Sequence, residues 1–417
     1  MTRISSLSRP AKILLATFGV LLLLAAVRQI TGAEDLTSSG TAGAALRLAV
    51  PIGLAGLGGL YSERSGIWNI GLEGTMILGT WFGAYGAWEL GPWWGVAFGM
   101  LGGALGGVIH AVATVVFNVD HIISGVAIVI LSSGLARYLS VIAYDGGSGG
   151  GPTQSPRVEN TIPNITLPFS SGGEIFGWKS PDLLGSIDRA NIFLVSDGAG
   201  ILGGFTRGVS LLTVIAALLI PFSAWLLWRT RFGLRLRSSG ESPSAAESLG
   251  VSVARMRFAG VMISGALSGL GGAFLSIVAS SIYREGQTAG RGYIGLATMI
   301  FGNWRPGGVA AGAGLFGFAD ALQLRSAASV RALLLAIAAL LGIFAWVMVV
   351  RRRAVPAAAS FVFGALFLTW FLSTDRVPSQ ITFCTPYAVT LIVLAFASQR
   401  LRPPKEAGLP YRRGEAR

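Results

Sequence analysis

The chain has 417 residues, of which 52% are hydrophobic and only 12% are charged, and its mean hydropathy is +0.65. Soluble domains carry about 25% charged residues, so this composition excludes an ordinary soluble protein and indicates a multi-pass membrane protein. The single cysteine excludes an intramolecular disulfide and any cysteine-based metal site. The two histidines leave little for metal binding or acid–base chemistry.

A membrane-spanning helix needs about 20 mostly apolar residues. The first such segment follows a basic start and resembles a signal peptide. Because many apolar segments follow it, we interpret it as an uncleaved first helix. The predicted spans in this part of the chain cover residues 12–30, 43–60, 70–90, 93–117 and 122–143.

A polar stretch rich in Gly, Pro and Ser then covers residues 144–207. We predict an irregular loop on the outer side of the membrane, with room for a short interfacial helix. A sixth span is predicted at 208–228. It is followed by a basic, polar cytoplasmic loop at 229–257 and a seventh span at 258–281.

Residues 292–323 contain two short apolar runs separated by "GNWRPGG". We predict two short or re-entrant helices joined at this Pro/Gly break. Further spans are predicted at 331–350, 356–372 and 383–398. The fold class is therefore an all-α polytopic membrane protein with about twelve transmembrane segments.

The net charge of +13 is explained by membrane topology. If the N-terminus lies inside and the segments alternate, the inner loops collect most of the 32 Lys and Arg residues, including the run at 351–353 and the basic tail at 399–417. Both termini are therefore predicted to be cytoplasmic. Membrane lipid is an expected partner, and nucleic acid is not.

Two stretches of the sequence are similar to each other. "IGLEGTMILG" (70–79) and "IGLATMIFG" (294–302) share Ile, Gly, Leu, Thr, Met, Ile and Gly when one gap is allowed. The predicted topology lets them enter the membrane from opposite sides, which favours an inverted repeat with broken helices near the midplane. A chance match between segments of similar composition is the alternative.

Four longer stretches resemble the permease subunits of ABC importers for nucleosides and simple sugars, and specifically the nucleoside branch of the branched-chain amino acid/ribose-type superfamily. They are "GLYSERSGIWNIGLEGTMILG" at 59–79, "NVDHIISGVAIVILSSGLARYL" at 118–139, "GESPSAAESLGVSVARMRFAGVMISGALSGLGGAFLS" at 240–276 and "GRGYIGLATMIFGNWRPGGVAAGAGLFGFADALQLR" at 290–325. "RPPKEAGLPY" at 402–411 resembles the family's C-terminal tail. Together they cover about half of the chain, in the family's order.

The resemblance implies a single transmembrane permease domain at 1–417, with a ten-helix core of the type II ABC importer kind. Residues 326–375 would then be an inserted two-span segment. The implied substrate is a nucleoside, and a simple sugar of the ribose or galactose type is the alternative within the superfamily. The implied location is a bacterial-type inner membrane.

The resemblance also implies that this chain is not an enzyme and holds no cofactor. ATP and Mg would be used by a cytoplasmic ABC ATPase, and the sequence has no G-x-x-x-x-G-K-[ST] motif. The other implied partners are a second homologous permease, forming a heterodimer, and an extracytoplasmic substrate-binding lipoprotein.

A permease must receive force from its ATPase through a cytoplasmic helix, and "ESPSAAESLG" suits that role. Ser242 and Pro243 suit a helix start, the two alanines permit close docking, and Gly250 suits a helix end. The family places its coupling helix here. The expected coupling residues are Glu241, Ser242, Pro243, Ala245, Ala246 and Gly250. The alternative is an ordinary amphipathic loop helix.

Polar residues within apolar segments are candidates for the translocation path, because such residues are costly in a membrane. The candidates are Asn69, Glu73, Asn303 and Asp320. Glu63 and Arg64 are interpreted as a solvated turn with an ion pair, and a polar element at the cytoplasmic mouth or along the path is the alternative.

Three other features have structural interpretations. Asp120 is expected to begin a helix. For Trp304 and Arg305 two interpretations stay open: they belong with Asn303 to the polar element of the path, or they anchor the chain at the membrane interface. The glycine-rich stripes are predicted to be helix contacts; they comprise Gly53, Gly56, Gly58, Gly59, Gly265, Gly269, Gly271 and Gly272.

Two other classes of protein remain as alternatives. An ion-coupled secondary transporter would also use broken helices, but it has no need of a coupling loop. A membrane enzyme is disfavoured, since no Cys, His and acidic residues cluster in the sequence.

Overall fold

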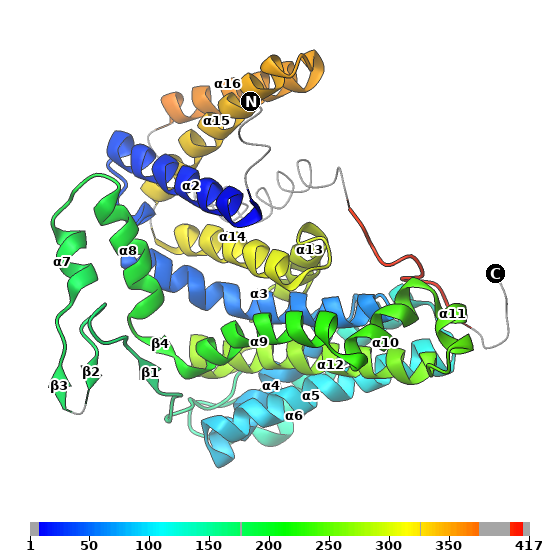
Figure 1. The fold of residues 1–417 in the computed structure, drawn as a ribbon. Helices are drawn as coiled ribbons and strands as arrows, with labels where there is room; N and C mark the ends of the chain where they lie inside the picture. The colour runs from blue at the N-terminus through cyan, green and yellow to red at the C-terminus, as the bar shows by residue number, and fades with distance from the viewer. Residues whose placement is uncertain (1–7, 176, 326, 375–400, 412–417) are drawn as a thin grey trace. The chain divides into compact units, whose positions relative to one another are not determined.

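The computed structural model describes residues 8–175, 177–325, 327–374 and 401–411. The regular secondary structure of the described chain is helical apart from strands of two residues each, as Figure 1 shows. It forms two compact units. The first contains the described residues of Met1–Leu46, Ile165–Val209 and Phe318–Val389, and the second those of Arg47–Asn164, Ser210–Gly317 and Thr390–Arg417.

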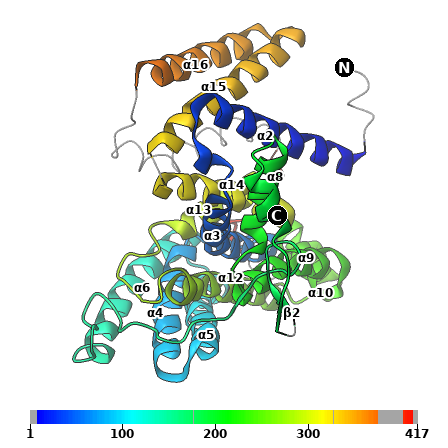
Figure 2. The same ribbon diagram turned by 90° about the vertical axis from the view of Figure 1, so that its left-hand side faces the viewer.

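The first unit is built from segments that are far apart in the sequence. Its elements are α2 (Arg9–Thr31), the 3₁₀ turn η1 (Glu34–Leu36), β2 (Glu174–Ile175), β3 (Trp178–Lys179), α7 (Leu183–Arg189), α8 (Val195–Thr206), α15 (Ala327–Val350) and α16 (Ala354–Ser373). Strands β2 and β3 pair as an antiparallel hairpin. Helices α15 and α16 lie along each other (Figure 2). Val27, Leu36 and Ala332 form part of the buried core.

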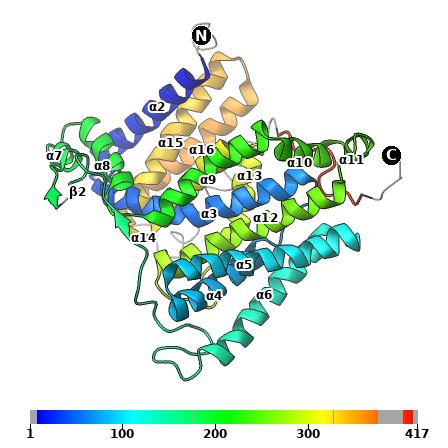
Figure 3. The same cartoon turned by 60° about the horizontal axis from the view of Figure 1, so that its bottom comes forward.

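The second unit holds most of the candidate site residues. Its elements are α4 (Leu72–Leu90), α5 (Pro92–Ala111), the π-helical turn η2 (Val112–Val116), α6 (His121–Ala143), α9 (Leu211–Arg229), α10 (Arg231–Glu241), α11 (Pro243–Ser248), α12 (Val253–Phe274), the π-helical turn η3 (Leu275–Ala279) and α13 (Arg291–Phe301). Helices α4, α5 and α12 pack side by side, and α6 packs on α4 (Figure 3). The remaining elements have residues in both units; they are α3 (Ser39–Ser65), β1 (Asn164–Ile165), β4 (Val209–Ser210) and α14 (Pro306–Arg325).

Glycines allow the helices of the second unit to touch through their backbones. A Cβ on Gly269 of α12 would lie 2.4 Å from the carbonyl oxygen of Gly99 on α5, and a Cβ on Gly272 would lie 2.2 Å from that of Met76 on α4. A Cβ on Gly58 would lie 2.6 Å from the carbonyl oxygen of Ser264. At these distances no residue larger than glycine fits at the three positions unless the helices move apart. The prediction that the glycine stripes are helix contacts is confirmed.

We expect Gly269→Ala to destabilise the protein, because the new methyl group would force α12 away from α5. Overpacking of this kind costs about 1–3 kcal/mol. Gly134→Ala on α6 is the matched control, since a Cβ there meets nothing within 4 Å. Thermal unfolding of the purified variants in detergent would measure the difference. Equal midpoints for the two variants would contradict the role assigned to the glycine contact.

The predicted helices agree closely with the observed ones. The spans expected at 122–143 and 356–372 correspond to α6 and α16, and the predicted break in 292–323 separates α13 from α14. Seven of the described helices are long and apolar enough to cross a membrane. The all-α, multi-pass class is therefore established. The span expected at 383–398 lies outside the described residues, so the count of twelve stays a prediction.

The polar segments contain more structure than expected. Residues 144–207 were predicted to be an irregular loop with room for one short helix, and they include two helices, α7 and α8, as well as the β2–β3 hairpin. Four residues of α8 are glycine, which lowers helix propensity, so the sequence pattern does not predict both helices. The basic loop at 229–257 includes α10 as well as α11.

A buried ion pair holds α8 within the first unit. Arg28 Nε of α2 lies 3.0 Å from Asp197 Oδ1 of α8, and the Asp197 side chain is fully buried. The same carboxylate accepts hydrogen bonds from the Thr37 hydroxyl at 2.6 Å and from the Leu194 amide at 3.1 Å. The outer segment is thus attached to the first helix of the chain by a desolvated charge pair.

Candidate functional site

The segment expected to couple to an ATPase forms the helix α11. Pro243 occupies its first turn, as predicted, but the Ser242 side chain makes no capping hydrogen bond. Gly250 adopts a left-handed φ of 80°. Its amide donates to the Glu247 carbonyl and the Val251 amide donates to the Ala246 carbonyl, which is the Schellman arrangement. The prediction that Gly250 ends the helix is confirmed.

The two faces of α11 differ in exposure. Pro243 and Ala246 are buried inside the chain. Ser244, Ala245 and Ser248 are exposed, and Leu249, directly after the helix, is 85% exposed. The Ala246 methyl group packs within the chain, and the role of this residue in docking stays a prediction. Leu249 is not among the residues expected to couple, although it is far more exposed than Ala246.

The C-terminal segment 401–411 connects α11 to the turn that precedes α4. The Tyr411 hydroxyl donates to the Glu247 carboxylate on α11. The Glu406 amide donates to the Gly240 carbonyl, and the Gly408 amide donates to the Gly66 carbonyl at 3.0 Å. This tail therefore contacts both α11 and the turn at 66–71.

Arg257, at the start of α12, anchors the same segment. Its side chain is buried, its Nη1 donates to the Leu409 carbonyl at 3.0 Å, and its guanidinium lies 5.6 Å from the centre of the Tyr411 ring. A cation over an aromatic ring is stabilised by about 0.5–2 kcal/mol. The tail thus supplies one hydrogen-bond acceptor and one aromatic ring to a buried charge.

We expect Tyr411→Ala to loosen the attachment of α11 to the tail, because α11 loses its bond to the tail and Arg257 loses its aromatic contact. Loss of a charged hydrogen bond costs about 1.5–3 kcal/mol. Tyr411→Phe is the matched control, which keeps the ring and loses only the hydroxyl. Hydrogen exchange of the α11 amides would be measured together with thermal unfolding of the purified chain, and we expect Tyr411→Phe to lie between the wild type and Tyr411→Ala. Unchanged exchange in Tyr411→Ala would show that the tail does not hold α11.

Glu63 and Arg64 lie in the last turn of α3, and the interpretation of a solvated turn is wrong. Glu63 is buried, and its carboxylate accepts a hydrogen bond of 2.7 Å from the Trp304 indole. Arg64 donates to the Trp304 carbonyl at 2.9 Å and pairs with Glu241 at 3.3 Å. Trp304 is only 5% exposed, so it is a buried bridge between α3 and the α13–α14 break, and the interface-anchor interpretation is wrong too.

Glu73 connects the start of α4 to the start of α13. Its two carboxylate oxygens accept hydrogen bonds from the Gly290 amide at 2.9 Å and the Gly292 amide at 2.7 Å. The carboxylate thus caps α13 and lies at the positive ends of two helices, where a negative charge is stabilised.

The other path candidates have separate surroundings. Asn69 is fully buried, and its amide donates to the Ser264 hydroxyl at 2.9 Å, while its Oδ1 has no hydrogen-bond partner among the described residues. Asn303 accepts from the Arg402 amide at 2.8 Å. Asp320 is half-buried in α14, in the first unit. Of these residues, Asn303 lines the pocket described below, and the role of all four candidates in a path stays a prediction.

The two similar stretches occupy different positions in their helices. The first stretch begins α4, so that Gly79 lies within the helix, whereas the second ends α13 and Gly302 is its C-cap. The helices meet at Glu73, near the N-terminus of each. The inverted repeat stays a prediction.

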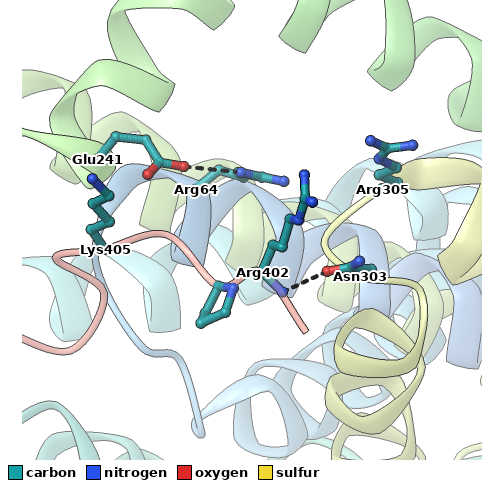
Figure 4. A pocket seen from close by; sticks show the side chains of 7 residues that line it. Arg64, Glu241, Asn303, Arg305, Arg402 and Lys405 are labelled. Atoms are coloured by element: carbon teal, nitrogen blue, oxygen red, sulfur yellow. Dashed lines mark hydrogen bonds and ion pairs between the residues drawn. The ribbon is translucent and has the colours of Figure 1, made fainter. Parts of the chain in front are cut away.

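A basic pocket of about 420 Å³ lies beside these contacts (Figure 4). It is lined by Arg64, Glu241, Asn303, Arg305, Arg402, Pro403 and Lys405. Glu241 and Asn303 are candidates from the sequence, for coupling and for the path, but the sequence does not indicate that they share a pocket, because the lining residues come from four separate segments of the chain.

A second hollow, of about 210 Å³, lies beside α4 and the segment that joins η3 to α13. Thr80, Ser133 and Tyr283 are among its lining residues. Burial raises the pKa of Tyr283 to about 12, so its phenol is neutral at physiological pH.

The histidines have structural roles, and among the described residues no group of His, Cys, Asp and Glu is arranged to hold a metal ion. His110 is buried, with its ring nitrogens 2.9 Å from the Ser124 hydroxyl and 3.0 Å from the Trp68 carbonyl. Asp120 accepts from the Ile122 and Ile123 amides, so it caps α6 as predicted.

The model of one protein family, described as the permease component of branched-chain amino acid transport systems, matches residues 41–367. The chain is similar to guanosine ABC transporter permease protein NupQ of Bacillus subtilis, with 31% identity over 89% of this chain and 96% of the relative. It is 36% identical to nucleoside ABC transporter permease protein NupC of Lactococcus lactis, over 66% of this chain and 78% of the relative.

A third relative carries a different substrate in its name. Putative glucose ABC transporter permease protein TsgC13 of Haloferax volcanii is 32% identical over 69% of this chain and 78% of the relative. No solved structure gives a significant match.

Proposed function

This chain belongs to the family of branched-chain amino acid transport system permease components, and from that premise we propose that it forms the translocation path for a nucleoside in an ATP-driven importer. The observation that carries the proposal is the similarity to the guanosine permease, which extends over 89% of this chain and 96% of that protein. Because one relative is named as a putative glucose permease, a simple sugar is the second candidate substrate.

In this proposal the force for transport enters through α11. Ala245 on the exposed side of the helix and Leu249 directly after it offer a small apolar surface for an ATPase. The opposite side, with Pro243 and Ala246, packs on the chain and passes movement to its neighbours. The tail at 401–411 then links α11 to the turn before α4, and Glu73 links α4 to α13.

The proposed assembly contains a cytoplasmic ABC ATPase, which uses ATP and Mg, a second homologous permease and an extracytoplasmic substrate-binding lipoprotein. This chain requires no cofactor of its own in that scheme. The proposed location is a bacterial-type inner membrane with both termini in the cytoplasm. Asn69, Glu73, Asn303 and Asp320 are the proposed polar contacts of the path, while residues 326–375 form an addition to a ten-helix core.

Reconstitution in liposomes would test the proposal. The chain would be incorporated with its ATPase and second permease, and the binding protein would be added outside. We expect saturable uptake of radiolabelled guanosine that requires ATP and is inhibited by other nucleosides but not by ribose or glucose. Uptake of glucose with no uptake of guanosine would favour the sugar permease. Uptake by this chain alone, driven by an ion gradient, would identify a secondary transporter.

A further inference from the structure

The basic pocket brings together four segments that are distant in the sequence. Arg64 ends α3 and Glu241 ends α10, while Arg305 lies in the break between α13 and α14. Arg402 and Lys405 come from the tail. Figure 4 shows Arg305 on one side of the pocket and Lys405 with Glu241 on the other, with the Arg402 side chain between them.

The charges of the pocket do not balance. Four cationic side chains line it and Glu241 is the one lining carboxylate. That carboxylate is paired with Arg64 at 3.3 Å. Among the described residues, Arg305, Arg402 and Lys405 form no ion pair. The pocket therefore has three positive charges without a partner in the part of the chain that the structure describes.

The geometry around these charges is fixed by the backbone. The Arg402 amide donates to Asn303 Oδ1 at 2.8 Å, which attaches the tail to the α13–α14 break. Arg305 directly precedes the 20-residue helix α14, and its carbonyl accepts from the Val309 amide. The positive end of that helix dipole adds to the potential beside Arg305.

The residue types indicate the chemistry of the ligand. A guanidinium offers a planar pair of donors that suits the oxygens of phosphate, and an ammonium adds a point charge. Arg305, Arg402 and Lys405 are all exposed, so an anion can reach them without displacing a buried group. Basic pockets between membrane helices on the cytoplasmic side suit anionic headgroups.

We propose that this pocket binds a phosphate-bearing anion, supplied as the headgroup of an anionic membrane lipid or as a soluble phosphate. The bound phosphate bridges the tail to the α13–α14 break and so strengthens the attachment made by the Arg402 amide. This assignment does not depend on the nature of the transported solute.

The experiment compares two sources of phosphate on the full-length chain in nanodiscs. One arm uses neutral phosphatidylcholine discs titrated with inorganic phosphate, with chloride at equal ionic strength as reference. The other uses discs that contain phosphatidylglycerol, with retained lipid counted by native mass spectrometry after transfer to detergent. The midpoint of thermal unfolding is recorded in both arms.

The test variant is Arg305→Gln/Arg402→Gln, and its matched control is Arg231→Gln/Arg235→Gln. The control removes the same charge from exposed positions on α10 that do not line the pocket. The described bonds of Arg305 and Arg402 are made by their backbones, so the test variant should fold. Lys405→Gln is a second, milder variant.

We expect saturable stabilisation of the wild-type chain in one of the two arms, and that arm identifies the source. In the test variant the affinity should fall at least tenfold, and in Lys405→Gln about threefold. The control should bind like the wild type. Absence of binding in both arms would overturn the proposal, and so would equal losses in the test variant and the control, which would show only general charge attraction.

Discussion

Leu249→Arg is expected to abolish ATP-driven uptake by the assembled transporter while leaving the chain folded. Leu249 is 85% exposed directly after α11, so the arginine meets no clash within the chain. In the assembly it would place a bulky charge where we propose that the ATPase docks. Substitutions at the centre of an interface cost 2 kcal/mol or more, which corresponds to at least about 30-fold weaker association.

The measurement is uptake in liposomes, together with retention of the ATPase on the immobilised permease. Leu234→Arg is the matched control, because Leu234 is also highly exposed but lies on α10. Leu249→Met should keep uptake, since it preserves an apolar side chain of similar volume. Normal uptake by Leu249→Arg would show that the ATPase does not dock at this end of α11.

Asp197→Asn is expected to destabilise the first unit by about 3–5 kcal/mol, the usual cost of removing one partner of a buried ion pair. The substitution leaves the Arg28 guanidinium, which is 13% exposed, without its counter-charge. It also weakens the acceptor for the Thr37 hydroxyl. Hydrogen exchange of the α8 amides and thermal unfolding of the purified chain would both report the loss.

Two variants define this effect. Glu285→Gln removes a partner of the exposed pair with Arg137, whose side chains are 63% and 39% exposed, and should cost less than about 1 kcal/mol. The double replacement Arg28→Met/Asp197→Asn should recover much of the stability, because it removes both charges and keeps an acceptor for the Thr37 hydroxyl or the Leu194 amide. If Asp197→Asn unfolds like Glu285→Gln, the buried pair does not stabilise α8.

The helices of this chain were predictable because a membrane leaves few alternatives. A long apolar run has to be a helix, since every backbone group must be bonded within the segment. The limits of α6 and α16 follow from that requirement. The end of α11 was predictable for a local reason, because glycine adopts at little cost the left-handed conformation found at Gly250.

The partners of the polar residues were not predictable from the sequence. Glu73 has many polar residues nearby in the sequence, yet it binds amides more than 200 positions away. Trp304 and Arg64 looked like an anchor and a solvated turn because their surroundings in the sequence are polar or interfacial. Their burial depends on α3 and the α13–α14 break packing together, and local composition carries no information on that contact.

The backbone contacts among α4, α5 and α12 have a consequence for how the molecule moves. Sliding one of these helices past another would bring side chains into places where even one carbon does not fit. Packed interiors of this kind change by discrete steps and not by gradual shear. The three helices should therefore travel as one rigid block during a transport cycle. The chain must then change direction outside this block, as it does at the break at Asn303 and Trp304, where both residues have a left-handed backbone.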